Sequence, residues 1–164
     1  MSGVNHALHQ FDPAKLAATE KEWRRQLQAH KKDILATEYE RILGWTGKRI
    51  DYGKAASENF VYGIFENGSG HAVALVDMVY QKAAKKWLKL MDIFLCPAVD
   101  LSFATQNVDI QQLTSIYAAA VIGTIQLTST AHPTKVTKLY GRSGTLLAFL
   151  KGVGTYIANN SNVP

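Results

Sequence analysis

Residues 60–96 read FVYGIFENGSGHAVALVDMVYQKAAKKWLKLMDIFLC, a pattern that predicts three consecutive antiparallel strands. The first two strands are joined at Asn67-Gly68, because this pair readily adopts the positive backbone angles of a tight hairpin. A polar turn over residues 81–86 leads into the third strand. That strand ends before Pro97, since proline has no N–H to donate to a sheet. The stretch is therefore predicted to be a three-stranded meander.

Counting outward from the middle of the second turn gives a register in which Asp77 lies opposite Asp92. Seven apolar side chains are assigned to the same face of the sheet: Phe60, Tyr62, Ile64, Leu75, Val79, Leu90 and Phe94. The opposite face is also apolar, and a sheet of this kind must be covered on both sides. The sequence therefore predicts an α/β/α sandwich whose central sheet is mainly antiparallel, with about four to five strands.

The flanking segments supply the covers for this sheet. Helical spacing of apolar residues predicts a helical region over residues 12–44, broken near residues 30–33. The other expected elements are the meander over 58–97, a helix over 109–129, a strand over 134–140 and a helix over 143–158. Residues 1–11 and 159–164 are expected to be flexible. With 164 residues, nearly half of them apolar, the chain is long enough for one domain with a real core.

Composition excludes several classes of protein. No apolar run approaches the roughly 20 residues of a membrane span, and the first residues lack the pattern of a signal peptide, so a cytoplasmic protein is expected. The single cysteine, Cys96, excludes a disulfide framework, and the five histidines have no metal-binding spacing, so no metal site is predicted. The net charge of +5 is compatible with an acidic partner without selecting one, and a dimer is compatible with the sequence.

The Asp77 and Asp92 pair is the sharpest chemical signal in the sequence. Two carboxylates that face each other on an apolar surface repel and lose hydration, so one of them keeps its proton to higher pH. Such a group suits a general base that takes a proton from an amine. The alternative is that each aspartate lies near a strand end or pairs with one of the many lysines.

A second candidate site is Gly141-Arg142-Ser143-Gly144, at the predicted start of the last helix. Free N–H groups, the positive end of a helix dipole and an arginine together suit an anion such as a phosphate. The alternative is a plain helix cap with a surface arginine. Tyr140, next to this segment, is either a general acid or a packing residue.

The order of helical pair, three strands, helix, strand and helix resembles the GNAT acyltransferase superfamily over residues 13–158. The resemblance implies a cofactor, acetyl-CoA or another acyl-CoA, and a small-molecule or protein amine as substrate. It implies that residues 87–96 hold the pantetheine arm through backbone near Phe94 and Cys96. If Tyr140 is a general acid, the leaving thiolate is the group that it would protonate. The resemblance also implies a set of residues around the pyrophosphate: Thr105, Gln106, Asn107, Arg142 and Ser143.

The sequence departs from the family pattern in three places. Residues 98–108, where the family has a glycine-containing pyrophosphate loop, form a predicted loop without any glycine. No strand is evident before the first helix, and the family's final strand pair is not seen, which predicts a truncated version. Two functions therefore stay open: an acyl-CoA-dependent N-acyltransferase, or a non-catalytic binding protein of GNAT-like or sandwich fold with an acidic protein or a nucleic acid as its partner.

Overall fold

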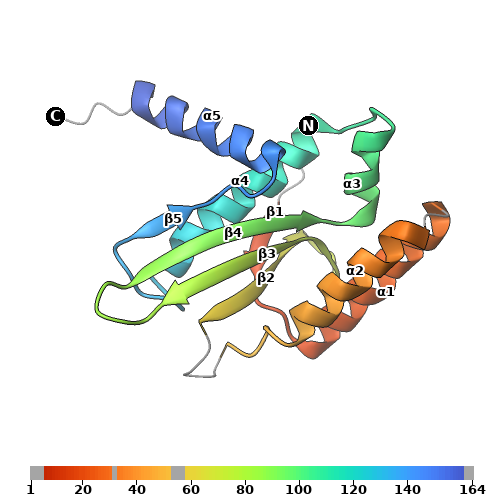
Figure 1. Ribbon diagram of the computed structural model, residues 1–164, viewed down its shortest axis with the longest axis horizontal. Helices are drawn as coiled ribbons and strands as arrows, with labels where there is room; N and C mark the ends of the chain where they lie inside the picture. Colours follow the sequence, from red (N-terminus) through yellow and green to blue (C-terminus); the bar gives the residue numbers. More distant parts are fainter. Residues whose placement is uncertain (1–5, 31–32, 53–57, 161–164) are drawn as a thin grey trace.

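The computed structural model describes residues 6–30, 33–52 and 58–160 of the chain. Within them lies one curled sheet with the strand order β1-β2-β3-β4-β5 (Figure 1). Its strands are β1 (His6–His9), β2 (Asn59–Glu66), β3 (Ala72–Gln81), β4 (Trp87–Leu95) and β5 (Thr137–Leu139). The first four strands pair antiparallel, whereas β5 runs parallel to β4. The predicted α/β class is confirmed, and the sheet is mixed.

Helices cover both faces of this sheet, as the apolar character of both faces predicts. They are α1 (Pro13–His30), α2 (Asp33–Gly47), α3 (Pro97–Ala104), α4 (Ile110–Leu127) and α5 (Gly144–Asn160). The pair α1 and α2 lies on one side of the sheet, while α4 crosses the other side with α5 beyond it (Figure 1). No helix in the described residues is long and apolar enough to cross a membrane.

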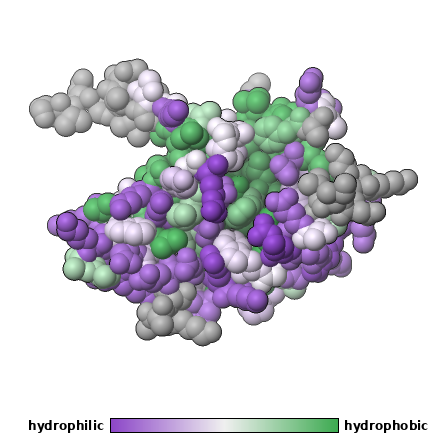
Figure 2. All heavy atoms as spheres, in the orientation of Figure 1, coloured by the Kyte–Doolittle hydropathy of each residue, from purple (hydrophilic) through white to green (hydrophobic). Residues whose placement is uncertain are grey.

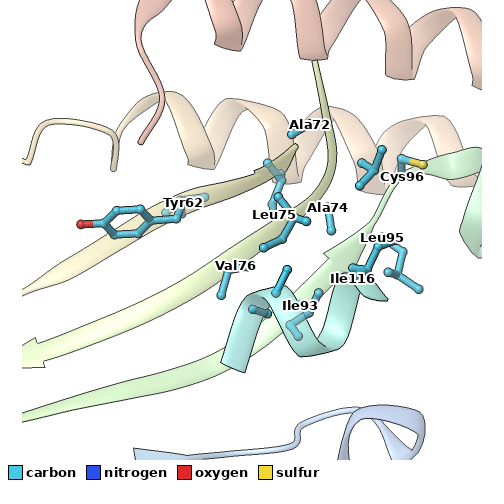
Figure 3. Close-up of a cluster of buried hydrophobic side chains, with 14 of the residues drawn as sticks. Tyr62, Ala72, Ala74, Leu75, Val76, Ile93, Leu95, Cys96 and Ile116 are labelled. Carbon is cyan, nitrogen blue, oxygen red and sulfur yellow. The ribbon is translucent and has the colours of Figure 1, made fainter. Parts of the chain in front are cut away.

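The core lies between the sheet and these covers. On the α4 side, Ile116 sits beside Ile93 and Leu95 of β4 (Figure 3), and all three side chains are buried. On the α1 side, the indole N–H of the buried Trp23 donates to the carbonyl of Ala72 at 2.8 Å. That hydrogen bond satisfies the polar atom of a large core residue and fixes α1 against the start of β3.

The β3–β4 register confirms Asp77 opposite Asp92. Beyond this pair the register shifts by one residue, so that Met78 faces Leu90 and the predicted pairing of Val79 with Leu90 is wrong. Met91 is the extra residue, and it makes a bulge in β4. A bulge adds a residue to one strand without altering its composition, so counting from the turn does not reveal it.

The assignment of β2 side chains to a face was also wrong. Tyr62 lies opposite Val76, so it shares the face of Val76, and not the face of Asp77. Phe60 and Ile64 follow Tyr62, because alternate residues of a strand share a face. A register shift between Ile64 and Phe65 explains the error, since a slip of one residue exchanges the two faces.

The opening strand, which the sequence does not make evident, is present. Strand β1 lies within the segment expected to be flexible, and it pairs with β2 along its four residues. Its Leu8 contacts Gly123 of α4 so closely that a Cβ at Gly123 would clash with the leucine side chain. Four residues, of which the first and last are histidines, give too short a pattern to identify a strand.

Two other elements differ from their predicted form. Helix α3 occupies most of the predicted loop over residues 98–108, and Pro97 is its first residue as well as the stop of the strand before it. Proline suits that place, because the first helical N–H has no partner within the helix. Strand β5 spans three residues, fewer than the predicted 134–140.

Candidate functional site

Strands β4 and β5 part after a short parallel contact. Their pairing runs from Leu88 opposite Thr137 to Leu90 opposite Leu139, and the N–H of Tyr140 then donates to the carbonyl of Leu90 at 3.0 Å. Strand β4 continues to Leu95, whereas the chain after β5 turns away into α5. The surface between α3 and α5 is conspicuously apolar (Figure 2).

A cavity of about 400 Å³ opens where the strands part, and we refer to it as the cleft cavity. Its lining comes from α2, β4, α3, α4 and the start of α5. The lining residues are Glu38, Tyr39, Ile42, Asp92, Ile93, Phe94, Leu95, Asp100, Phe103, Tyr117, Ser143 and Thr145. One wall of the cleft cavity is thus a strand edge, and the others mix aromatic side chains with acidic and hydroxyl ones.

The edge of β4 in the cleft cavity exposes backbone groups away from β3. The N–H of Cys96 donates to Val73 of β3 at 2.8 Å, so by the alternation of a ladder Ile93 and Leu95 present their backbone to the other side. There the N–H of Ile93 donates to Oδ1 of Asp92 at 2.9 Å. The carbonyl of Leu95 lies 3.3 Å from the Tyr39 hydroxyl, which makes its shorter hydrogen bond to Oδ2 of Asp100 at 2.8 Å. Both partners are side chains, which an extended ligand could replace along the edge.

A second cavity, of about 370 Å³, adjoins the first, and we refer to it as the charged cavity. It is lined by Arg41, Ile42, Trp45, Arg49, Asp77, Asp92, Phe94 and Arg142. Three of these residues, Ile42, Asp92 and Phe94, also line the cleft cavity. The two spaces therefore meet at Asp92.

Asp77 is the deeper member of the acidic pair. It is 7% exposed, and burial raises its pKa to about 6, an effect that Arg49 opposes and the charge of Asp92 reinforces. Its Oδ1 lies 3.5 Å from Nη1 of Arg49, yet this atom has no hydrogen-bond partner in the described structure. The guanidinium of Arg49 in turn rests on the ring of Trp45, 4.2 Å from its centroid. Asp77 is thus an incompletely satisfied carboxylate.

Asp92 is the accessible member of the pair. Its pKa is also raised by burial, against the lowering effects of the Ile93 N–H and the positive charge of Arg142. A carboxylate with a raised pKa that borders two cavities can accept a proton from a group bound in either of them. The geometry thus brings together Asp77, Asp92 and Arg142 of the predicted site residues.

The predicted pyrophosphate residues before α4 are engaged with their own chain. The N–H of Asn107 donates to Ser102 at 3.0 Å, that of Gln106 to Phe103 at 3.3 Å, and the Thr105 hydroxyl to Ser102 at 3.1 Å. None of Thr105, Gln106 and Asn107 is among the residues that line the two cavities.

The N-terminus of α4 itself already holds an anion. A carboxylate oxygen of Asp109 accepts from the N–H of Gln112 at 3.0 Å and caps the helix. The capping carboxylate occupies the place where a helix would offer N–H groups to a phosphate.

The remaining predicted residues are divided between the cavities and the rest of the molecule. Ser143 caps α5 by accepting from Leu146 at 3.1 Å, and it lines the cleft cavity together with Phe94. Tyr140 is exposed, lies under the ammonium of Lys89 and lines neither of the two cavities.

Cys96 belongs to the core. It is 3% exposed, and burial raises the pKa of its thiol to about 11, so the thiol stays protonated and unreactive near neutral pH. Its backbone N–H is taken by Val73 of β3. Of the two residues assigned to the pantetheine strand, Phe94 therefore faces the cleft cavity and Cys96 does not line it.

Arg41, Arg49 and Tyr39 line the site without having been predicted to do so. All three come from α2 or the residues just after it, which the sequence marks only as a cover for the sheet. The basic residues of this region look like ordinary surface charge in the sequence. Their role depends on how the end of α2 meets β3 and β4, which local patterns do not encode.

Comparison with known proteins adds little to this description. No protein-family model matches the chain, and no curated protein matches it significantly. Among solved structures, the crystal structure of a possible acetyltransferase from Clostridium difficile 630 is similar, with a TM-score of 0.40 and 10% sequence identity over 96% of this chain and 90% of that chain. A likeness this distant does not assign an activity. No group of metal-ligating side chains occurs within the described residues.

Proposed function

We propose that the protein is a GNAT-like N-acyltransferase that moves an acyl group from a pantetheine thioester, such as acetyl-CoA or another acyl-CoA, to an amine. The observation that carries this proposal is the position of Asp92. It stands opposite a second carboxylate, has a raised pKa and borders both cavities. One cavity suits the donor and the other suits the acceptor, so the base lies where the two would meet.

The cleft cavity suits a pantetheine arm because this arm is extended and carries amide groups. Such a chain can pair with the backbone of Ile93 and Leu95 as an added strand does, while Phe94 and Phe103 offer apolar contact. The phosphates of a CoA donor would find no open helix terminus at α4, where Asp109 is the cap. Ser143 and Thr145 at the start of α5 are the polar groups left for them.

A bound thioester supplies an acyl carbon open to attack and a thiolate as the leaving group. Asp92 takes the proton that the attacking amine loses as the new C–N bond forms and the C–S bond breaks. The thiolate leaves with the bonding electrons and takes a proton from water. Asp77 helps because its negative charge and the shared burial increase the affinity of the pair for a proton.

A non-catalytic binding protein is the second candidate. It is favoured by the engaged N–H groups before α4 and by the carboxylate of Asp109 at the helix start, which together leave no cradle for a diphosphate at this helix. The net charge of +5 would suit an acidic protein or a nucleic acid as the partner.

The two candidates are separated by acyl transfer from acetyl-CoA and from acetyl-pantetheine, which lacks the diphosphate and the nucleotide. Thiol release is followed with a panel of amines. Because α4 offers no cradle, we expect kcat/KM for the two donors to agree within about tenfold, less than the loss of several charge-assisted contacts would cause. If neither donor supports acyl transfer and neither gives a heat of binding at millimolar concentration, the enzyme is excluded and the binding protein is favoured.

A further inference from the structure

We infer that the acceptor is an amino acid or a close analogue, whose amine meets Asp92 and whose carboxylate is held by Arg142 and Arg41 in the charged cavity. This inference rests on the proposed function, because it names the substrate class of the same site. It is carried by the arrangement of charges around the acidic pair.

The charged cavity contains more guanidinium groups than carboxylates. Arg41, Arg49 and Arg142 contribute three positive charges, and Asp77 and Asp92 contribute two negative ones, so three minus two leaves a net charge of +1. A simple ammonium ion entering this space would be repelled overall. A zwitterion brings no net charge, and each of its ends has an opposite charge available in the cavity.

Only one of the three arginines is committed to a carboxylate in the described part of the chain. Arg49 is stacked on Trp45 and lies 3.5 Å from Asp77. Arg142 lowers the pKa of both aspartates through its charge, but neither Arg142 nor Arg41 forms an ion pair within 4 Å among the described residues. Both of these exposed arginines line the charged cavity, and a forked guanidinium matches the two oxygens of a carboxylate.

On the negative side of the cavity, one carboxylate oxygen lacks a hydrogen bond from the described residues. Oδ1 of Asp77 is buried and has no hydrogen-bond partner within the described residues, although the cavity reaches this residue. Buried polar atoms are rarely left in this state unless a water or a ligand serves them. An ammonium group has three donors, enough to reach both aspartates while the other end of the molecule extends toward the arginines.

The apolar lining narrows the class of amino acid. Trp45 and Phe94 meet edge to face with their ring centroids 5.9 Å apart, and Ile42 lies beside them in the same cavity. This wall suits an uncharged, apolar or aromatic side chain. The volume of about 370 Å³ is ample for a single amino acid.

The test compares amino acids with the amines that remain when their carboxylate is removed. Phenylalanine is paired with phenethylamine, and leucine with 3-methylbutylamine. We expect kcat/KM to favour the amino acid by about 10- to 100-fold in each pair, the effect of a charge-assisted bidentate contact. Arg142→Ala should abolish most of this preference, and Arg142→Lys should restore it only in part.

Arg25→Ala is the matched control, because Arg25 lies on α1 with Glu22 as its partner and lines neither cavity. Arg41→Ala provides a second variant in case Arg142→Ala disturbs α5. Equal use of amine and amino acid, or an equal fall in both rates when Arg142 and Arg41 are replaced, would overturn the inference.

Failure of the proposed function has a different signature, namely no acylation of any amine by the wild-type protein. In that case, calorimetry with phenylalanine in the absence of any donor still tests whether the charged cavity binds an amino acid. Binding that is weakened by Arg142→Ala or Arg41→Ala would support the site without the reaction. No binding of phenylalanine or leucine at millimolar concentration would overturn it.

Discussion

Asp77 of β3 lies directly opposite Asp92 of β4, immediately before the bulge at Met91 shifts the rest of the ladder by one residue. Like charges in directly opposed positions destabilise an antiparallel sheet, and both carboxylates are also partly desolvated. Bulges often redirect side chains next to functional sites. The fold thus carries an unfavourable pair at the point where its two cavities meet, which is typical of a site selected for function and not for stability.

Replacing Asp92 tests its role as the base. Asp92→Asn keeps the shape of the side chain but cannot accept the proton, so we expect the turnover of acyl transfer to fall by about 10² or more while the fold is retained. Steady-state kinetics and thermal unfolding of the same preparation measure the two quantities. In the wild type, the rate should also fall as the pH drops through the raised pKa of the pair. Unchanged turnover in Asp92→Asn would remove this residue from the mechanism.

The difference in stability between Asp77→Asn and the wild type should increase with pH. The pKa of Asp77 is raised from 3.8 to about 6 in the folded protein, so the unfolded chain releases this proton at lower pH than the folded one. The wild type therefore loses stability as pH rises from about 4 to 6, and the cost is fully present above 6. Because the asparagine does not ionise, we expect the variant to gain about 1–3 kcal/mol over the wild type at pH 8 and less at pH 4. Urea unfolding at both pH values measures this, and a difference that is constant with pH would contradict it.

His132 should contribute with the opposite sign. Its ring lies 4.6 Å from that of Phe60 and 4.9 Å from that of Tyr80, and its Nε2 is 2.8 Å from the hydroxyl of Tyr62. Burial, reinforced by the charge of Lys82, lowers its pKa from 6.5 to about 4. The unfolded chain takes up this proton first, so stability is lost as pH falls from about 6.5 to 4.

The expected loss from His132 is up to about 3 kcal/mol, and it partly cancels the gain from Asp77 over the same range. Glutamine does not titrate in this range. The free energy of unfolding of His132→Gln should therefore fall less than that of the wild type when the pH is lowered. Chemical denaturation of wild type and variant at pH 4.5 and 7.5 gives the comparison. An equal loss on acidification in both proteins would show that His132 is not the group responsible.

Elements with long, regular patterns could be predicted from the sequence. The meander, the helical pair and α4 follow from alternation, helical spacing and the Asn67-Gly68 turn, and the opposed aspartates follow from counting outward from the second turn. Features that depend on one residue or on a distant contact could not be predicted. The bulge at Met91 leaves no trace in composition. Strand β1 is recognisable only in the folded structure, where it pairs with β2 and its Leu8 packs against Gly123.

Of the residues that line the charged cavity, the sequence pointed to Asp77, Asp92 and Arg142, but not to Arg41 or Arg49. Asp77 and Asp92 come from neighbouring strands, whose register a turn can set. Arg41 reaches the same cavity from α2, Arg49 from the residues after α2, and Arg142 from the turn before α5. Their convergence is a property of the packed molecule. The family resemblance implied an anion site at the polar residues before α4, but a capping aspartate and local hydrogen bonds use these groups instead.

Two glycines test what holds the start of α5 in position, directly after Arg142 and Ser143. A Cβ at Gly141 would come within 2.6 Å of Cα and 2.7 Å of N of Leu147, which are backbone atoms of α5, whereas a Cβ at Gly144 would meet nothing within 4 Å. Since helix backbone cannot yield as a flexible side chain does, Gly141→Ala should displace the start of α5 and lower the free energy of unfolding by about 1–3 kcal/mol.

The same displacement should weaken amino-acid binding in calorimetry, because Arg142 moves with the turn that precedes α5. Gly144→Ala is the matched control, because it makes the same substitution at the first residue of the helix, where the added Cβ meets no other atom within 4 Å. This variant should be neutral or stabilised by up to about 1 kcal/mol. Thermal unfolding of both variants and calorimetry with phenylalanine measure the two effects. If the variants unfold and bind alike, the close approach of Gly141 to Leu147 does not hold α5 in place, and Arg142 must be positioned by other contacts.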